Sequence, residues 1–347
     1  MSSEIMIFSE EIINWYEKNK RDLPWRLTKD PYKIWISEII LQQTRVDQGM
    51  PYYIRFLEKF TTIKVLADAS EIEVLNLWQG LGYYSRARNL HFTAKYIDKH
   101  YNGIFPSDYS EIRKLKGIGN YTAAAIASFC YNLPYPVLDG NVSRVLTRFL
   151  SSEIPIDSSK GRKYLEFMSG KLMNKQKPDL YNQAIMEFGA LQCTPKNPQC
   201  CICPLKKICK SYGTDLVNLL PIKTRNLKVR NRYFNYIIIK LEDSTFIRKR
   251  TEGIWHSLYE FPLIEGNLEL EEIQKSSLWK SLFYGNNFVI EDVSLLMKHK
   301  LSHQTILAKF IVVSIEHIND NNFLRVEWDQ LVNYPIPRLI HKYLISQ

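Results

Sequence analysis

The sequence predicts a protein of two parts, a nearly all-α region followed by an α+β domain. Up to about residue 212 apolar residues recur at helical spacing, whereas after residue 232 they form strand-like runs. Between them, residues 206–232 carry eight Lys or Arg and one Asp. We therefore expect a helical region at 1–212, a basic linker at 213–232 and a second domain at 233–347. The linker either follows a phosphate backbone or is a solvated tether.

Individual segments support this division. "VSRVLTRFL" places its apolar residues at i, i+3, i+4, i+7 and i+8, and residues 71–97 predict two helices broken at Gly80 and Gly82. In the second domain, "YFNYIIIKL" and "TFIRK" flank the turn "EDS" and predict a hairpin. Residues 293–317 predict another hairpin, and "PRLIHKYLI" predicts a closing helix.

Charge and targeting signals narrow the class of protein. The 347 residues have 46 Lys or Arg against 36 Asp or Glu, a net charge of +10 that suits nucleic acid, an anionic membrane surface or a merely basic protein. The N-terminus predicts an amphipathic helix rather than a signal peptide, and no run approaches a membrane span. We expect a cytoplasmic protein, in which six cysteines indicate metal binding or catalysis rather than disulfides.

Four cysteines form a metal-binding pattern. Cys193, Cys200, Cys203 and Cys209 are spaced C-x6-C-x2-C-x5-C, and Cys201 is expected to point away. Soft thiolates suit an iron–sulfur cluster or zinc. Structural zinc sites usually separate two close pairs by a longer stretch, so one tight loop over 193–209 favours a [4Fe-4S] cluster.

A carboxylate stands among apolar residues in "WISEIILQQTRV". If the segment is one helix, Glu38, Gln42 and Arg45 share a narrow polar stripe. The simplest interpretation is that this stripe faces water. The alternative is that Glu38 is a buried functional acid.

Two further motifs carry candidate functional residues. "LKGIGNYTAAAIASF" predicts a turn at Gly117 and Gly119 opening an alanine-rich helix, either an ordinary turn or a helix-hairpin-helix element with free N–H groups for a phosphate. "PVLDGNVSR" places Asp139 just before a helix, where Asp is a good N-cap. A capping role and a catalytic role do not exclude each other.

The order of these motifs resembles the adenine DNA glycosylases of the helix-hairpin-helix glycosylase superfamily. "RDLPWR", "SEIILQQTRV", "GLGYYSRARNL", "KGIGNYTA", "LDGNVSRV" and "NQAIMEFGALQCTP" carry the resemblance, which is dense over residues 10–212 and looser afterwards. It implies an all-α helix-hairpin-helix fold with one [4Fe-4S] cluster, followed by an α+β Nudix-like domain. It also implies an enzyme of base excision repair that removes adenine mispaired with 8-oxoguanine or guanine in duplex DNA.

The resemblance assigns the chemistry to two carboxyl groups. It makes Glu38 the acid that protonates adenine N7, and it makes Asp139 the carboxylate that stabilises the electron-poor sugar. By the same resemblance Asn141 orients Asp139, Tyr121 hydrogen-bonds nearby, and the Gly117–Gly119–Asn120 turn holds the DNA backbone. The lyase relatives carry a lysine at the position of Tyr121, so we expect a monofunctional enzyme.

The resemblance also names residues that hold the DNA. It places Trp25, Arg26 and Gln183 in the adenine pocket, and it assigns the opposite strand and the gap left by base flipping to Gln43, Thr44, Leu81 and Tyr83. Trp25 and Leu81 are also compatible with plain core positions, and Gln43 with an exposed helix position.

The second domain lacks a full Nudix signature, so no pyrophosphatase activity is expected. The family reads 8-oxoguanine with Phe-Ser-His at a hairpin tip, and this chain has Leu301, Ser302 and His303 there. Leu301 loses aromatic stacking and keeps an apolar wedge, while Ser302 can accept the N7–H that only the oxidised base has. The alternative is a simple polar turn.

Two other functions compete with this one. An endonuclease III-like glycosylase and lyase would share the helical region, but Tyr121 and the additional C-terminal domain argue against it. A non-enzymatic iron–sulfur DNA-binding regulator would explain the charge and the cysteines, but it gives Glu38 and Asp139 no joint purpose. We expect a monomer that binds duplex DNA and no membrane.

Overall fold

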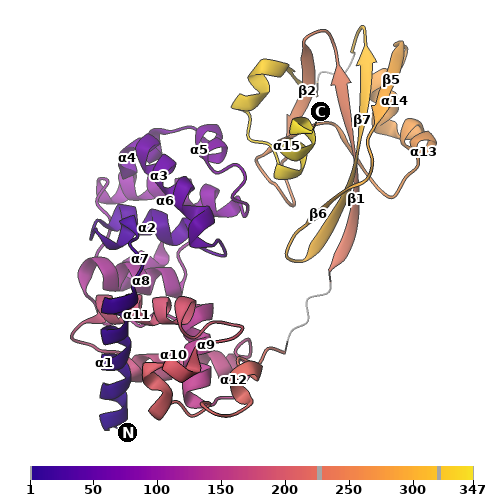
Figure 1. Cartoon of the computed structure of the whole chain (residues 1–347). Helices are drawn as coiled ribbons and strands as arrows, with labels where there is room; N and C mark the ends of the chain where they lie inside the picture. The colour runs from indigo at the N-terminus through magenta and orange to yellow at the C-terminus, as the bar shows by residue number, and fades with distance from the viewer. Residues whose placement is uncertain (1, 225–228, 319–321, 347) are drawn as a thin grey trace. The chain divides into compact units, whose positions relative to one another are not determined.

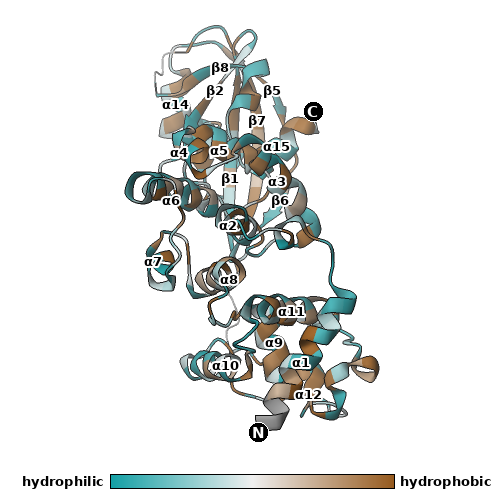
Figure 2. Cartoon of the chain, turned by 90° about the vertical axis from the view of Figure 1, so that its left-hand side faces the viewer, coloured by the Kyte–Doolittle hydropathy of each residue, from teal (hydrophilic) through white to brown (hydrophobic). Residues whose placement is uncertain are grey.

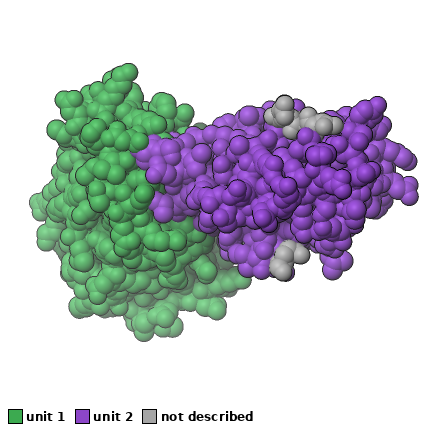
Figure 3. All heavy atoms as spheres, turned by 90° about the horizontal axis from the view of Figure 1, so that it is seen from above, with its two compact units in different colours: residues 1–68, 89–225 green, residues 69–88, 226–347 purple. Residues whose placement is uncertain are grey.

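The computed structural model describes residues 2–224, 229–318 and 322–346 (Figure 1). It divides into two compact units, residues 1–68 with 89–225 and residues 69–88 with 226–347 (Figure 3). The second unit therefore includes a segment, 69–88, that the sequence analysis assigned wholly to the helical region. Hydrogen bonds from Arg88 Nη1 to His256 O (2.6 Å) and from Asn76 Nδ2 to Asn333 O (2.6 Å) fix this segment to the C-terminal residues.

Unit 1 is built of helices, as the periodicity predicts. Its α-helices are α1 (Ser2–Asn19), α2 (Pro31–Ile40), α3 (Val46–Lys59), α4 (Ile63–Asp68), most of α6 (Ser85–Tyr101), α7 (Tyr109–Lys114), α8 (Asn120–Tyr131), α9 (Gly140–Leu150), α10 (Ser159–Leu172), α11 (Pro178–Leu191) and α12 (Leu216–Leu219). Short 3₁₀ helices lie at η1 (Pro24–Arg26), η2 (Cys200–Ile202) and η3 (Pro204–Lys207). Hydrophobic and hydrophilic stretches alternate along these helices (Figure 2), because each buries one face.

The first half of the predicted linker, residues 213–224, belongs to unit 1 and is not a tether. Residues 216–219 form α12, and the chain after it is bonded to unit 1. Ile156 N donates to Ile222 O at 3.0 Å, and Thr224 N donates to Asp157 at 3.0 Å. Residues 225–228 of the predicted linker lie outside the described residues, and β1 begins at Arg230.

Unit 2 contains a mixed sheet and a smaller antiparallel sheet. The larger has the order β4 (Leu263–Glu265), β1 (Arg230–Lys240), β7 (Gln304–Ile315) and β5 (Phe288–Val293), with β6 (Met297–Lys300) also paired to β7. β1 and β7 are parallel, and the other pairs are antiparallel. The smaller sheet has the order β3 (Tyr259–Glu260), β2 (Ser244–Lys249) and β8 (Leu324–Glu327).

Helices cover both faces of the larger sheet. One face packs Phe234, Tyr236 and Phe310 against residues of α15 (Arg338–Ile345). The other packs Ile237, Ile239 and neighbours against α13 (Leu270–Lys275) and α14 (Ser277–Phe283). Helix α5 (Glu71–Leu77) and the 3₁₀ helix η4 (Trp328–Asn333) complete the unit.

The two predicted hairpins have different outcomes. β6 and β7 pair as expected, and their register runs from Met297↔Ala308 to Lys300↔Thr305. β1 and β2 form as strands, but they enter different sheets and share only the bridge Leu241↔Ser244. The local turn was therefore predicted, whereas the pairing partners were set by distant strands that compete for each edge. The helix predicted at "PRLIHKYLI" is present as α15.

No helix in the described parts of the chain has the length and the hydropathy that a membrane crossing requires.

Candidate active site

Glu38 is buried, so the interpretation as a water-facing stripe is wrong. Helix α2 starts at Pro31 after the N-cap Asp30 and ends at Ile40. Gln42 and Arg45 therefore lie beyond the helix and do not share a helical face with Glu38. The Glu38 side chain is 6% exposed. Tertiary packing overrides the stripe, because the surrounding parts of unit 1 cover nearly all of the Glu38 side chain.

The surroundings of Glu38 favour its protonated form. The pKa of the Glu38 carboxyl is raised to about 7, mainly because the group is buried; a hydrogen bond from Tyr121 and the charge of Arg26 lower this pKa, and the nearby Asp139 raises it. A carboxyl group with such a pKa holds a proton near neutral pH and can give it to a base.

Asp139 caps helix α9 and is held from two sides. Its Oδ1 accepts from Val142 N at 2.7 Å, and its Oδ2 accepts from Asn141 Nδ2 at 3.1 Å. Burial raises the pKa of Asp139, while these donors and Arg144 lower it. The donors therefore stabilise the ionised form within a poorly solvated site.

Tyr121 lies in the first turn of α8, directly after the glycine turn, and its hydroxyl hydrogen-bonds Glu38. Gly117 has φ +84°, and an added Cβ there would lie 2.8 Å from Asn89 Cβ. Helix α8 starts after Gly119 without a side-chain cap, which leaves its first N–H groups available. The charges of both Glu38 and Asp139 contribute, after burial, to a pKa of Tyr121 well above the usual value.

Arg26 is anchored by the carboxylate of Glu187, which is 161 residues away in the sequence. Its Nη1 and Nη2 donate to Glu187 at 3.0 and 2.7 Å, and Arg21 Nη2 donates to the same carboxylate at 2.7 Å. Burial would raise the pKa of Glu187, but the hydrogen bonds from Arg21 and Arg26 lower it to about 2. This ion triad fixes Arg26 with its charge near Glu38.

Replacing Glu187 by Gln should destabilise the protein by about 3 kcal/mol at neutral pH, because two arginines lose the anion that they share. A depressed carboxyl pKa stabilises the fold above the unfolded pKa and ceases to do so as the pH falls through the folded pKa. The wild type should therefore lose this contribution between about pH 4.5 and 2, whereas Glu187→Gln should not. Urea unfolding at several pH values measures the loss of stability and its pH dependence. Glu17→Gln, which breaks the exposed pair with Lys20, is the control.

Gln183 and Trp25 are also held by neighbours within unit 1. Tyr16 Oη donates to Gln183 Oε1 at 3.0 Å, and the guanidinium of Arg26 lies 5.4 Å from the centre of the Tyr16 ring. Trp25 packs edge-on against Tyr53 at 5.1 Å. The Tyr16 contact leaves the amide nitrogen of Gln183 as the group able to donate to a ligand.

Arg144 links helix α9 to the cysteine loop. Its Nη2 donates to Asn141 Oδ1 at 2.9 Å and to Gly189 O at 2.6 Å, and its Nε donates to Cys193 O at 2.8 Å. Because Asn141 in turn donates to Asp139, the loop and the carboxylate are connected by successive hydrogen bonds.

The four predicted ligand cysteines lie in one loop and are partly buried, whereas Cys201 is exposed as expected. Burial raises the pKa of Cys203 to about 12, with further contributions from Cys193, Cys209 and Cys200. In the described part of the chain, no group of three or more His, Cys, Asp or Glu side chains is arranged to hold a single metal ion.

Arg148, on α9, contacts the cysteine loop through its guanidinium group. Its Nη1 lies 3.5 Å from Cys193 Sγ and donates to Thr194 O at 2.7 Å, and its Nη2 donates to Pro195 O at 3.1 Å. This buried guanidinium supplies positive charge beside the thiols, as a set of thiolate ligands requires.

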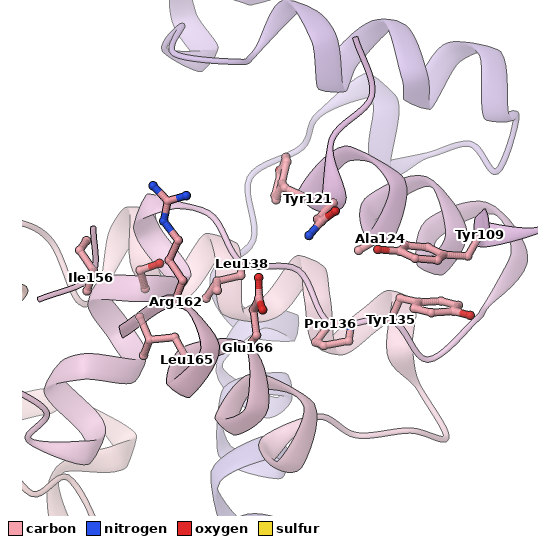
Figure 4. A pocket seen from close by; sticks show the side chains of 12 residues that line it. Tyr109, Tyr121, Ala124, Tyr135, Pro136, Leu138, Ile156, Arg162, Leu165 and Glu166 are labelled. Atoms are coloured by element: carbon pink, nitrogen blue, oxygen red, sulfur yellow. The ribbon is translucent and has the colours of Figure 1, made fainter. Parts of the chain in front are cut away.

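A cavity of about 490 Å³ is lined by Asn120 and Tyr121 at the start of α8. Figure 4 shows Arg162 and Glu166 extending from α10 toward the open space, with Tyr121 above them. Leu138 and Ser143, which flank Asp139 and Asn141 in sequence, also line it. This volume is within the range of ligand sites.

The residues predicted to contact the opposite strand are divided between the units. Gln43, exposed and with φ +55°, and Thr44 follow α2 in unit 1. Leu81, which is 5% exposed, and Tyr83 belong to unit 2, where the Tyr83 and Ser302 hydroxyl oxygens are 2.9 Å apart. Leu301 is partly buried, whereas Ser302 and His303 are exposed at the tip.

Several positioning residues were missed by the sequence analysis: Tyr16, Arg21, Arg144 and Glu187. Glu187 and Arg26 are 161 residues apart, and nothing local marks them as partners. "RDLPWR" and "NQAIMEFGALQCTP" contained Arg21 and Glu187, but a motif does not state which side chains meet.

Comparison with known proteins identifies both domains. Residues 36–167 match the HhH-GPD superfamily of base excision DNA repair proteins, and residues 235–346 match the NUDIX domain. A solved structure of a thermostable thymine-DNA glycosylase aligns with a TM-score of 0.57 at 27% identity, covering 61% of this chain and 97% of that one. The predicted fold class, a helical glycosylase region followed by a Nudix-like domain, is confirmed.

Curated relatives that match most of this chain are adenine DNA glycosylases. The protein of Buchnera aphidicola subsp. Baizongia pistaciae is 41% identical over 325 residues, 90% of this chain and 88% of the relative. That of the subspecies Acyrthosiphon pisum is 36% identical over 97% of both chains, and that of Arabidopsis thaliana is 34% identical over 75% of this chain and 48% of the relative. Because the Buchnera proteins align with it over nearly their whole lengths, the chain belongs to the adenine DNA glycosylase family, base excision repair enzymes that hydrolyse N-glycosyl bonds.

Proposed function

We propose that this enzyme binds duplex DNA as a monomer and releases adenine mispaired with 8-oxoguanine or guanine, leaving an abasic site. The observation that carries the proposal is a buried carboxyl group, Glu38, whose pKa is raised to about 7 beside a second carboxyl group, Asp139. Pairs of carboxyl groups with different environments are the usual means of cleaving a glycosidic bond near neutral pH.

Glu38 is the proton donor in this mechanism. Adenine leaves poorly as an anion, so the acid protonates N7 of the flipped base and the bond breaks as a neutral base departs. Tyr121 and Arg26 fix the donor in place, and the amide nitrogen of Gln183, whose oxygen is taken by Tyr16, contacts the base edge. Trp25 forms a further wall of this pocket.

Asp139 faces the sugar. Its negative charge stabilises the oxocarbenium-like ring as the base leaves, and Asn141 keeps the carboxylate aimed. The hairpin of Gly117, Gly119 and Asn120 holds the DNA backbone with its uncapped N–H groups. Because the hairpin carries a tyrosine in place of a lysine, no Schiff base forms and the strand stays intact.

The opposite strand is read by the remaining residues. Gln43, Thr44, Leu81 and Tyr83 fill the gap and contact the unpaired base, and Leu301, Ser302 and His303 recognise 8-oxoguanine. Ser302 contacts the edge of this base that differs from guanine.

We also propose that Cys193, Cys200, Cys203 and Cys209 bind one [4Fe-4S] cluster. In a cubane each thiolate binds a different iron, so the thiols need not converge on one point as they do around zinc. The cluster would hold the loop, and its lysines, in shape for DNA.

Single-turnover adenine release from duplexes that differ only in the base opposite adenine tests the function. We expect release opposite 8-oxoguanine and guanine, little opposite thymine, and strand cleavage only after alkali. Efficient borohydride trapping of the wild type on DNA would contradict the monofunctional assignment.

A further inference from the structure

Gln304 follows directly after the hairpin tip and is buried without hydrogen-bond partners. It is 0% exposed, and neither its Oε1 nor its Nε2 has a partner among the described residues. A buried carboxamide with both ends unsatisfied is rare and destabilising, and one reason for its presence is a second state of the protein in which both ends are bonded.

The strand register places Gln304 beside the predicted wedge. Lys300 pairs with Thr305 across β6 and β7, and Leu301 N donates to Gln304 O at 2.8 Å. Leu301 and Gln304 are therefore cross-strand neighbours, and neighbours of this kind point to the same face of the hairpin. Ser302 and His303 form the turn itself.

Leu301 cannot remain in its present position and also enter DNA. It packs against the cluster that contains Phe234, Phe310 and Ile306. A wedge inserted into a base step must leave that cluster. Its departure removes the cross-strand neighbour of Gln304 from the face to which Gln304 points.

We propose that Gln304 is a specificity-determining residue that reads the oxidised edge of the base opposite adenine. This inference rests on the proposed function. Oxidation gives guanine an N7–H donor beside a C8=O acceptor, which together form a cyclic amide. A carboxamide is its complement, since Oε1 accepts from N7–H while Nε2 donates to O8. Guanine offers an acceptor and a C–H at the same edge, so it cannot make the pair.

This role of Gln304 also offers a source of lesion preference in a chain that carries leucine at position 301, where the family has phenylalanine. Leucine offers the lesion no aromatic stacking, and the Ser302 hydroxyl lies 2.9 Å from that of Tyr83. A bidentate amide beside the wedge supplies discrimination that neither residue supplies alone.

Gln304→Met tests the inference, because methionine has a similar shape and no hydrogen-bonding amide. Single-turnover adenine release is measured opposite 8-oxoguanine and opposite guanine, with thermal unfolding on the same samples. We expect the ratio of the two rates to fall about 10- to 100-fold, the loss of one bidentate contact, with the rate opposite guanine unchanged. The melting temperature should rise, because a destabilising buried amide is gone.

Thr245→Val is the matched control. Thr245 is 0% exposed in the same unit, and its hydroxyl also lacks a partner among the described residues. Its replacement should raise the melting temperature and leave the rate ratio as it is. A ratio for Gln304→Met within twofold of the wild type, or a wild type without preference, overturns the inference. A wild type that releases no adenine from either duplex overturns the proposed function instead.

Discussion

Replacing Glu38 by Gln should reduce the single-turnover rate of adenine release by about a thousandfold, because in the proposed mechanism the departing base loses its proton donor. Wild-type release should fall about tenfold per pH unit above the pKa of about 7, whereas the residual rate of Glu38→Gln should not show this limb. Gel-shift binding to the mispaired duplex should persist in the variant. A variant that keeps the wild-type rate and pH profile excludes Glu38 as the acid.

The same substitution should stabilise the fold at alkaline pH. Between pH 4.5 and about 7 the unfolded chain loses the Glu38 proton while the folded chain retains it, so wild-type stability falls as the pH rises through this window. Glutamine has no proton to lose, and Glu38→Gln should be more stable by about 3 kcal/mol at pH 8. Ser37→Ala, which loses only a bond to Ile34 O, is the control for a local change in α2.

Asp139→Asn should reduce adenine release by a factor of about 100 to 1,000, because the electron-poor sugar loses its anion. Asparagine caps helices as well as aspartate does, but it has one acceptor oxygen, so the bond from Asn141 Nδ2 is lost and the free energy of unfolding should fall by about 1 kcal/mol. A large loss of adenine release with only this small loss of stability separates the charge from the cap.

Asp108→Asn provides the comparison at a second N-cap. Asp108 accepts from Ser110 N and Glu111 N at the start of α7, as Asp139 does from Val142 N at the start of α9. Its substitution should leave adenine release unaltered. If Asp108→Asn reduced adenine release as much as Asp139→Asn does, the effect of Asp139 would come from capping its helix and not from its negative charge.

The raised pKa of Asp139 adds an acidic limb to the rate profile. Since the ionised form is the one that stabilises the sugar, release should fall as the pH drops through the pKa of Asp139. Together with the limb from Glu38 this gives a bell-shaped profile, and Asp139→Asn should remove its acidic side.

The amino-acid sequence alone determined the fold class, the glycine turn, the cap at Asp139 and the composition of the cysteine loop. Each depends on neighbours within about twenty residues: helical periodicity, a positive φ at Gly117, a side chain one position before a helix, and closely spaced thiols.

Tertiary structure decided the state of Glu38, the partners of β1 and β2, and the networks around Arg26 and Asn141. These depend on groups far apart in the chain, such as Glu187, and a one-dimensional pattern does not record which groups meet. Burial in particular cannot be read from a stripe, because the same spacing on α2 suits water or a neighbouring helix. That difference raises the pKa of Glu38 to about 7 and makes it able to act as an acid.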